Sequence, residues 1–131
     1  TRMAFLIENG FSQKELVKHN LGPIVFYEHL YYFKELKPED HVRVSLELKG
    51  LSEDGMFFQF EHNIYNQNGD NCARCEMMGS WLDLNSRRLT RLPQHLLKPL
   101  EHLVKTEDYK ILTKEDTRKF GVKPKPLNST L

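Results

Sequence analysis

Residues 71–84 read NCARCEMMGSWLDL, and they hold both cysteines of the chain, Cys72 and Cys75. The preceding Asn68-Gly69 pair is a hairpin signal, so we expect this stretch to be the returning strand of a β-hairpin. Residues three apart on a strand point to opposite faces and lie roughly 10 Å apart, whereas a disulfide needs Cα atoms within about 7 Å. We therefore interpret both cysteines as small apolar strand residues and expect neither a redox site nor a metal site here.

Three more segments have the period-two pattern of strands. Residues 24–33 carry β-branched and aromatic side chains on both faces, which predicts a strand that is covered on both sides or lies at a subunit contact. Residues 42–48 alternate apolar and polar side chains, as is typical of a half-buried antiparallel strand. Residues 56–65 form a third strand. Together with the strand at 71–84, these segments predict an antiparallel meander.

The N-terminal residues have a helical pattern, and Gly10 predicts a C-terminal stop. The apolar positions at helical spacing are Met3, Leu6 and Ile7. Ser12 and Glu15 form a capping box for a short second helix over residues 13–18. The first helix has no cap before it, and the chain begins at Thr1 without an initiator methionine. We therefore expect further residues upstream of Thr1.

A helical pattern returns near the C-terminus. Its apolar stripe consists of Leu96, Leu97, Leu100, Leu103 and Val104. Pro99 lies inside this stripe and predicts a kink or a break. Residues 105–131 carry seven Lys/Arg against four Asp/Glu, and they read as a polar, basic extension. Within it, Thr113 and Asp116 predict the cap of a short helix that stops at Gly121.

The composition fits a single globular domain with no bias toward a charged partner. The chain has 131 residues, of which 39% are hydrophobic and 28% charged, and a formal net charge of +1. This charge gives no electrostatic reason to bind nucleic acid, and no apolar run approaches the ~18 residues of a membrane-spanning helix. Two cysteines are too few for a disulfide scaffold, so we expect a cytoplasmic protein.

Three segments carry a resemblance to a known family. They are RMAFLIENGFS (2–12), GPIVFYEHLYYFKELKPEDHVRVSLELKGLSEDG (22–55) and FFQFEHNIYNQNGDNCARCEMMGSWLDLNSRRLTRLP (57–93). Over about residues 1–100, the chain resembles the hotdog-fold acyl-CoA thioesterases of the hydroxybenzoyl-CoA thioesterase-like group. The most specific part is Trp81-Leu82-Asp83, followed by Arg87-Arg88 and Leu92-Pro93.

The resemblance implies an α+β hotdog fold, in which a curved antiparallel sheet wraps around a central helix. Residues 1–104 would form the hotdog domain and residues 105–131 a polar extension. The family's N-terminal strand would precede Thr1 and is absent from this sequence. Two subunits of such proteins join their sheets, so the resemblance implies a homodimer or a tetramer built as a dimer of dimers.

The implied activity is hydrolysis of an acyl-CoA thioester to a free acid and CoA, without a metal or other cofactor. Family members carry an acidic residue before Gly-His and Asn, in a loop that leads into the central helix. The acid acts on the thioester as base or nucleophile, and backbone N–H groups at the helix N-terminus hold the thioester oxygen. The sequence lacks this motif, so we expect the catalytic acid upstream of Thr1. The alternative is a non-catalytic hotdog module that binds acyl-CoA or serves as an assembly domain. A dehydratase would need a His and Asp pair on the helix loop, which the chain does not show.

Three residues within the chain are secondary catalytic candidates. Glu28 and His29 are adjacent on an aromatic strand and face opposite ways, so one of them can line an interfacial cleft. His62 shares the register of Phe58 and Phe60, and it therefore points toward the apolar face. The alternative for each is structural: a satisfied polar group at a dimer contact for Glu28 or His29, and a hydrogen-bonded core histidine for His62.

The sequence contains four other charged candidates for the site. We expect a solvated side chain for Glu8, and Glu76 lies beside two methionines that either fringe an acyl channel or simply pack. Arg87 and Arg88 follow the last predicted strand, and they are the candidates to bind the phosphates of CoA by charge-assisted hydrogen bonds. The alternative for both arginines is a solvated basic loop.

Overall fold

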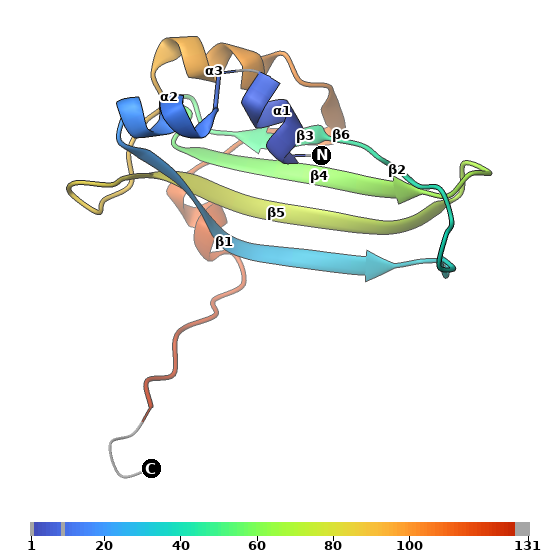
Figure 1. Ribbon diagram of the computed structural model, residues 1–131. Coiled ribbons are helices and arrows are strands. Elements are labelled where there is room, and N and C mark those ends of the chain that lie inside the picture. The colour runs from blue at the N-terminus through green and yellow to red at the C-terminus, as the bar shows by residue number, and fades with distance from the viewer. Residues whose placement is uncertain (1, 9, 128–131) are drawn as a thin grey trace.

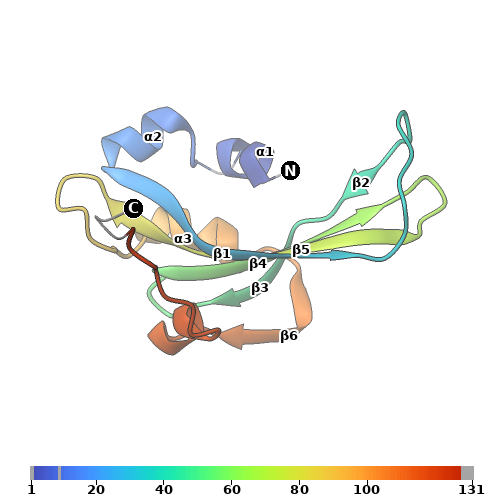
Figure 2. The same ribbon diagram turned by 90° about the horizontal axis from the view of Figure 1, so that it is seen from below.

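The computed structural model describes residues 2–8 and 10–127, and the side chains of the predicted stripe Met3, Leu6 and Ile7 lie outside the described part. The elements in chain order are α1 (Arg2–Glu8), α2 (Gln13–Lys18), β1 (Leu21–Tyr32), β2 (Arg43–Val44), β3 (Glu47–Leu51), β4 (Phe57–Tyr65), β5 (Asn71–Asp83), α3 (Gln94–Glu101), β6 (Lys105–Ile111) and the 3-10 helix η1 (Lys114–Arg118). The three α-helices cover one face of the sheet, while η1 lies on the other face (Figures 1 and 2). We call these the helix face and the outer face.

The strand order differs from the predicted meander. The sheet runs β1-β5-β4-β3-β6, and β2 pairs with β4. The pairs β1–β5, β5–β4 and β4–β3 are antiparallel, as the hairpin signals predict. However, β1 pairs with β5 rather than with the next strand, because the loop at residues 33–42 passes around the end of the β4–β5 hairpin (Figure 1). This order leaves β1 at a free edge of the sheet.

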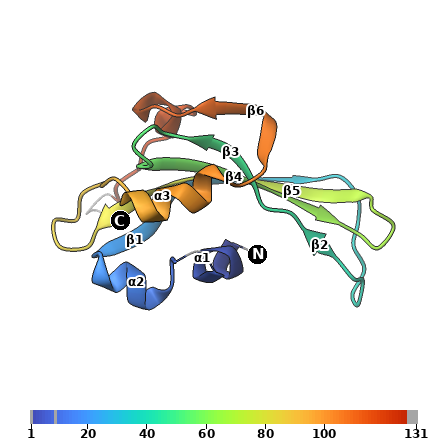
Figure 3. The same cartoon turned by 90° about the horizontal axis from the view of Figure 1, so that it is seen from above.

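The predicted strand at residues 42–48 is wrong in part, because it is broken into β2 and β3. Val44 in β2 is 38% exposed, whereas Leu48 in β3 is fully buried. The cause is position in the sheet: β2 lies along the end of β4 that extends beyond the described helices (Figure 3). The half-buried pattern therefore holds only for the part of the segment under the helices.

The predicted polar extension contributes a strand, which the sequence analysis missed. Lys105–Ile111 forms β6 and pairs parallel with β3. Leu112, directly after it, is only 3% exposed, and its side chain lies so close to Gly50 that a Cβ there would meet its Cδ2 at 2.6 Å. The predicted cap is confirmed, since the Thr113 backbone N–H donates to Asp116 Oδ2 at 2.8 Å at the start of η1.

The hydrophobic core fills the space between the sheet and the helices. Its buried members include Phe58, Phe60, Met77 and Trp81 from the sheet and Leu96, Leu97 and Leu100 from α3. Phe11, between α1 and α2, stacks on Trp81 with ring centroids 5.1 Å apart. Pro99 lies within α3 without breaking it, because the helix continues to Glu101. The core thus holds all three helices against one face.

Two smaller sequence predictions are confirmed. The Ser12 side chain accepts a hydrogen bond from the Glu15 backbone N–H at 3.2 Å, which caps α2 as predicted. Cys72 and Cys75 both lie on β5 as free thiols, with Cys72 buried and Cys75 half-buried. Among the described residues, no helix is long and apolar enough to cross a membrane.

Candidate active site

An apolar crevice of about 220 Å³ opens on the helix face beside the edge strand β1. Its lining residues are Arg2, Pro23, Ile24, Val25, Phe58, Phe60, Met77 and Trp81. Gly79 on β5 permits the close packing beneath it, since a Cβ at this position would lie 2.6 Å from the Ile24 carbonyl oxygen and 2.7 Å from the Phe58 ring. This crevice has the apolar lining that an acyl chain needs.

An ion pair links α1 to β1 at this crevice. Arg2, which lines the crevice, places its Nη2 3.2 Å from Glu28 Oε1, and the two side chains are 32% and 42% exposed. Glu28 lies on the helix face, because its cross-strand partner on β5 is the core residue Met77. The predicted candidate Glu28 therefore stands beside an apolar crevice with a cation as its partner. Sequence reasoning missed Arg2, because the helical pattern of the N-terminal residues does not show that this side chain faces Glu28.

His62 is buried on the helix face of β4, as the sequence register predicts. It is 6% exposed, and its ring lies 6.5 Å from that of Phe60, one of the residues that line the crevice. Its Nδ1 is 2.9 Å from the Ser45 carbonyl oxygen. An Nδ1–H that donates to this carbonyl leaves the lone pair on Nε2, and Nε2 is buried without a hydrogen-bond partner among the described residues.

The electrostatics around His62 favour its neutral form. Burial lowers the pKa of His62 below its ordinary value of 6.5. The hydrogen bond to Ser45 and the negative charge of Glu28 oppose this shift of the pKa, and the positive charge of Arg2 adds to it. The lowered pKa favours the uncharged form of the His62 imidazole, whose unpartnered Nε2 is buried.

Cys75 is the cross-strand partner of His62, but the two do not form a reactive ion pair. Burial raises the pKa of the Cys75 thiol, and the negative charges of Glu28 and Glu76 raise it further. Since the pKa of His62 is lowered at the same time, thiol and imidazole are both neutral near pH 7. This arrangement does not supply the thiolate that cysteine catalysis requires.

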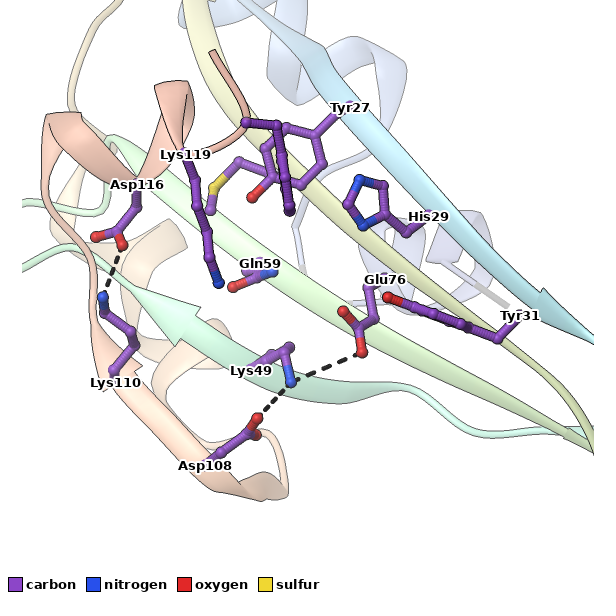
Figure 4. A pocket seen from close by; sticks show the side chains of 12 residues that line it. Tyr27, His29, Tyr31, Lys49, Gln59, Glu76, Asp108, Lys110, Asp116 and Lys119 are labelled. Carbon is purple, nitrogen blue, oxygen red and sulfur yellow. Dashed lines mark hydrogen bonds and ion pairs between the residues drawn. The ribbon is translucent and has the colours of Figure 1, made fainter. Parts of the chain in front are cut away.

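His29 lies on the outer face, away from Glu28 and His62. It lines a second cavity of about 310 Å³ with Tyr27, Tyr31, Lys49 and Glu76 (Figure 4). The sequence prediction that Glu28 and His29 face opposite ways agrees with their partners on β5, which are Met77 and Glu76. The two are thus separated by the sheet and do not belong to one site.

The charged groups in this outer cavity largely neutralise one another. Lys49 Nζ lies 2.6 Å from Asp108 Oδ2 and 3.8 Å from Glu76 Oε1. Burial alone would lower the pKa of Lys49, but the hydrogen bond to Asp108 and the nearby carboxylates raise it overall. Glu76, which the sequence analysis named as a candidate beside two methionines, is therefore a partner of Lys49 on the outer face.

The C-terminal segment closes the outer cavity. Phe120 packs its ring 4.4 Å from that of His29 and 5.1 Å from that of Tyr27. Lys110 Nζ and Asp116 Oδ1 form a hydrogen bond of 2.6 Å that ties β6 to η1. No sequence signal pointed to this cover, because the residues involved lie in a segment that reads as a polar extension.

Arg87 and Arg88 lie in the exposed loop after β5, as predicted. The Asp83 carboxylate shapes this loop by accepting hydrogen bonds from the Asn85 and Ser86 backbone N–H groups at 2.9 Å. Within the described residues, neither arginine has an ion-pair partner. Met77 and Asp83 are six positions apart on β5, a distance of roughly 20 Å, so the structure does not bring the arginines together with Glu28 or His62. Glu8 on α1 is exposed, in agreement with the expectation of a solvated side chain.

The class of the protein follows from the family to which its sequence belongs. The model of the Thioesterase-like superfamily matches residues 1–100, and the chain belongs to this superfamily. This match confirms the resemblance to acyl-CoA thioesterases that the sequence motifs indicated. No curated protein sequence matches the chain at a significant level.

Solved structures with the same fold support this assignment. A hypothetical protein from Staphylococcus aureus, solved in complex with CoA, is 19% identical, with a TM-score of 0.71 over 95% of this chain and 75% of that one. A 1,4-dihydroxy-2-naphthoyl-CoA thioesterase from Synechocystis is 15% identical, with a TM-score of 0.67 over 78% and 74%. A DHNA-CoA thioesterase from Staphylococcus aureus is 17% identical, with a TM-score of 0.63 over 76% and 66%. At these identities the likeness shows the fold alone, which is the α+β hotdog fold of acyl-CoA thioesterases.

Proposed function

We propose that the protein hydrolyses an acyl-CoA thioester to a free acid and CoA, with the acyl group in the helix-face crevice. The observation that carries this proposal is the position of His62, a buried imidazole with an unpartnered Nε2 and a lowered pKa. It lies near the Arg2–Glu28 pair and follows the crevice residue Phe60 by two positions on the same face of β4. Thioester hydrolysis needs a base for water and a positive group or donor for the developing oxyanion. This group of side chains offers both.

In the proposed reaction, His62 Nε2 takes a proton from a water molecule whose oxygen attacks the thioester carbonyl carbon. The tetrahedral intermediate then collapses, the C–S bond breaks, and the imidazolium returns the proton to the CoA thiolate. The Glu28 carboxylate stabilises the transient imidazolium, since its charge favours the protonated ring. Arg2 supplies positive charge for the oxyanion.

The resemblance also predicts an acidic residue upstream of Thr1, before Gly-His and Asn. This acid is the alternative to His62 as the group that activates the attacking water. The two assignments differ in what they expect of His62 variants. If the acid activates the attacking group by itself, His62 serves the fold rather than the reaction, and its replacement leaves turnover almost unchanged.

We propose further that two copies of the chain pair through β1. This strand lies at the free edge of the sheet, and it exposes several apolar side chains: Val25, Phe26, Leu30, Tyr31 and Tyr32. A long edge strand with unpaired backbone groups and exposed apolar side chains is a template for pairing with another strand. Such pairing gives a homodimer, from which the predicted tetramer would form by association of two dimers.

The remaining proposals concern CoA and the organisation of the chain. We propose that Arg87 and Arg88 bind the phosphates of CoA, because both are exposed and, in the described residues, without an ion-pair partner. Residues 1–104 form the hotdog domain in this proposal, and residues 105–131 an extension that adds β6 and η1. A cytoplasmic location fits the two free thiols.

The function is tested by measuring CoA thiol release from a panel of aliphatic and aromatic acyl-CoA thioesters with the gene product. Turnover of at least one thioester supports the proposal. An acyl-CoA that raises the melting temperature but releases no CoA favours the non-catalytic binding module instead. If no thioester is hydrolysed and none raises the melting temperature, both functions are rejected.

A further inference from the structure

Three side chains of metal-ligand type converge where α2 meets α3 on the helix face. Glu15 lies in α2 and His19 is its C-terminal cap residue. The spacing of four residues places both side chains on the same side of the helix. His95 comes from the start of α3, far along the sequence. Both helices lie on the same face of the sheet (Figure 3). This arrangement brings Glu15, His19 and His95 together.

The distances between the three groups suit a single ion. Their ligand atoms all lie within 4.8 Å of one another. His19 Nε2 and Glu15 Oε2 are 3.4 Å apart, and the rings of His19 and His95 have centroids 5.0 Å apart. Zinc bonds of about 2.0–2.1 Å in a tetrahedron separate neighbouring ligand atoms by roughly 3.3 Å. One pair thus already has the spacing of a tetrahedral edge, and the ligand atom of the exposed His95 lies within 4.8 Å of both.

We propose that Glu15, His19 and His95 bind Zn²⁺, with a water molecule as the fourth ligand. Two imidazoles and one carboxylate form a donor set that zinc prefers, whereas Ca²⁺ and Mg²⁺ take oxygen ligands. The side chains of His19 and Glu15 are 27% and 37% exposed, so the ion has access from solvent. Within the described residues, the ion pair with His19 is the only one that Glu15 makes, and the ion would replace that contact.

This site is separate from the proposed active site. His19 lies two positions before Leu21, the first residue of β1, which pairs with Asp83, while Glu28 pairs with Met77 farther along the same strand. The bound ion would clamp α2 to α3 and thereby fix the entry of the chain into the edge strand. The proposal does not depend on thioester hydrolysis. No sequence pattern predicts this site, because His95 lies in α3, and the strands β1 to β5 separate α3 from α2 in the chain.

The experiment is a calorimetric titration of the gene product with Zn²⁺, together with melting temperatures with and without the ion. We expect one Zn²⁺ per chain and a rise in melting temperature, because an ion that binds only the folded state stabilises it. His95→Ala changes an exposed residue, and it should weaken Zn²⁺ binding at least tenfold and abolish the thermal shift. Glu15→Gln should weaken binding in the same direction.

Two controls make the result specific. His41→Ala removes an exposed histidine from the loop between β1 and β2 and should leave Zn²⁺ binding unchanged. Mg²⁺ should give neither heat of binding nor a thermal shift. The proposal is overturned if the wild-type chain binds no Zn²⁺, or if His95→Ala and Glu15→Gln bind it as tightly as the wild type does, which would place the ion elsewhere.

Discussion

His62 Nδ1 lies 2.9 Å from the carbonyl oxygen of Ser45, in the link between β2 and β3. Two further hydrogen bonds of 2.9 Å hold Ser45 in place: the Asn63 backbone N–H donates to Ser45 Oγ, and the Ser45 N–H donates to the Asn63 carbonyl. The break between the two strands therefore orients the imidazole. With Nδ1 directed at this carbonyl, Nε2 is the buried nitrogen that has no hydrogen-bond partner among the described residues.

Burial of His62 makes stability depend on pH. Its pKa is lowered in the folded state from 6.5, so below pH 6.5 the unfolded chain takes up a proton that the folded chain does not. The free energy of unfolding should therefore fall as the pH drops below 6.5. His62→Gln should remove this contribution, since a glutamine amide can still donate to Ser45 but does not titrate. Urea denaturation of both proteins from pH 7.5 to pH 5 measures the difference, and parallel curves for the two proteins would contradict it.

β6 and the segment after it are part of the folded unit. Leu112 packs with Phe57 and Met78 in a second buried cluster on the outer face. Leu112→Ala should lower the free energy of unfolding by about 2–5 kcal/mol, as expected for a buried leucine. Val122→Ala is the matched control, because this residue is 88% exposed and should change stability by less than about 0.5 kcal/mol. Equal stability of the two variants in chemical denaturation would mean that residues 105–112 are the polar tail that the sequence suggested.

Dimer formation through β1 predicts a clear effect of charge at this edge. Leu30 is 56% exposed on the strand, and Leu30→Lys should convert the dimer to a monomer, since lysine on an edge strand opposes pairing. Val122→Lys adds the same charge at an exposed position outside the sheet and should leave the mass unchanged. Sedimentation velocity gives the mass of each protein. A Leu30→Lys protein that keeps the wild-type mass would exclude this interface.

Arg87 and Arg88 should affect binding of CoA rather than the chemical step. Replacing both by alanine should raise KM for acyl-CoA while kcat stays close to wild type, because the proposed contacts to phosphate lie far from the thioester. Arg43 is also an exposed arginine but lies on β2, away from this loop, so Arg43→Ala serves as the control. If the double variant and the control have the same KM, the loop after β5 does not bind CoA.

Local sequence signals predicted the elements well, and their failures have physical causes. The β-branched and aromatic residues at 24–33 predicted β1, the Asn68-Gly69 signal predicted the β4–β5 hairpin, and the Ser12 capping box predicted the start of α2. These patterns depend on neighbours in sequence. The pairing of β1 with β5 depends on long-range packing, so hairpin signals alone favoured a meander. β6 escaped notice because an edge strand exposes most of its side chains and therefore reads as polar.

The site was predictable only in part for the same reason. The register of β4 placed His62 on the apolar face, and adjacency placed Glu28 and His29 on opposite faces. No sequence pattern linked Arg2 to Glu28 across 26 positions or brought His95 to His19. These pairs exist because helices from distant segments share one face of the sheet.

The measurement that tests the account most directly is steady-state hydrolysis of acyl-CoA by the wild type, His62→Gln and His29→Gln. The two histidines lie on opposite faces of the sheet, which makes His29→Gln the matched control. Loss of a general base should lower kcat by about 100-fold or more for His62→Gln, with KM little changed and kcat of His29→Gln near wild type. A folded His62→Gln protein with wild-type kcat would contradict the account and move the chemistry to the acidic residue expected upstream of Thr1.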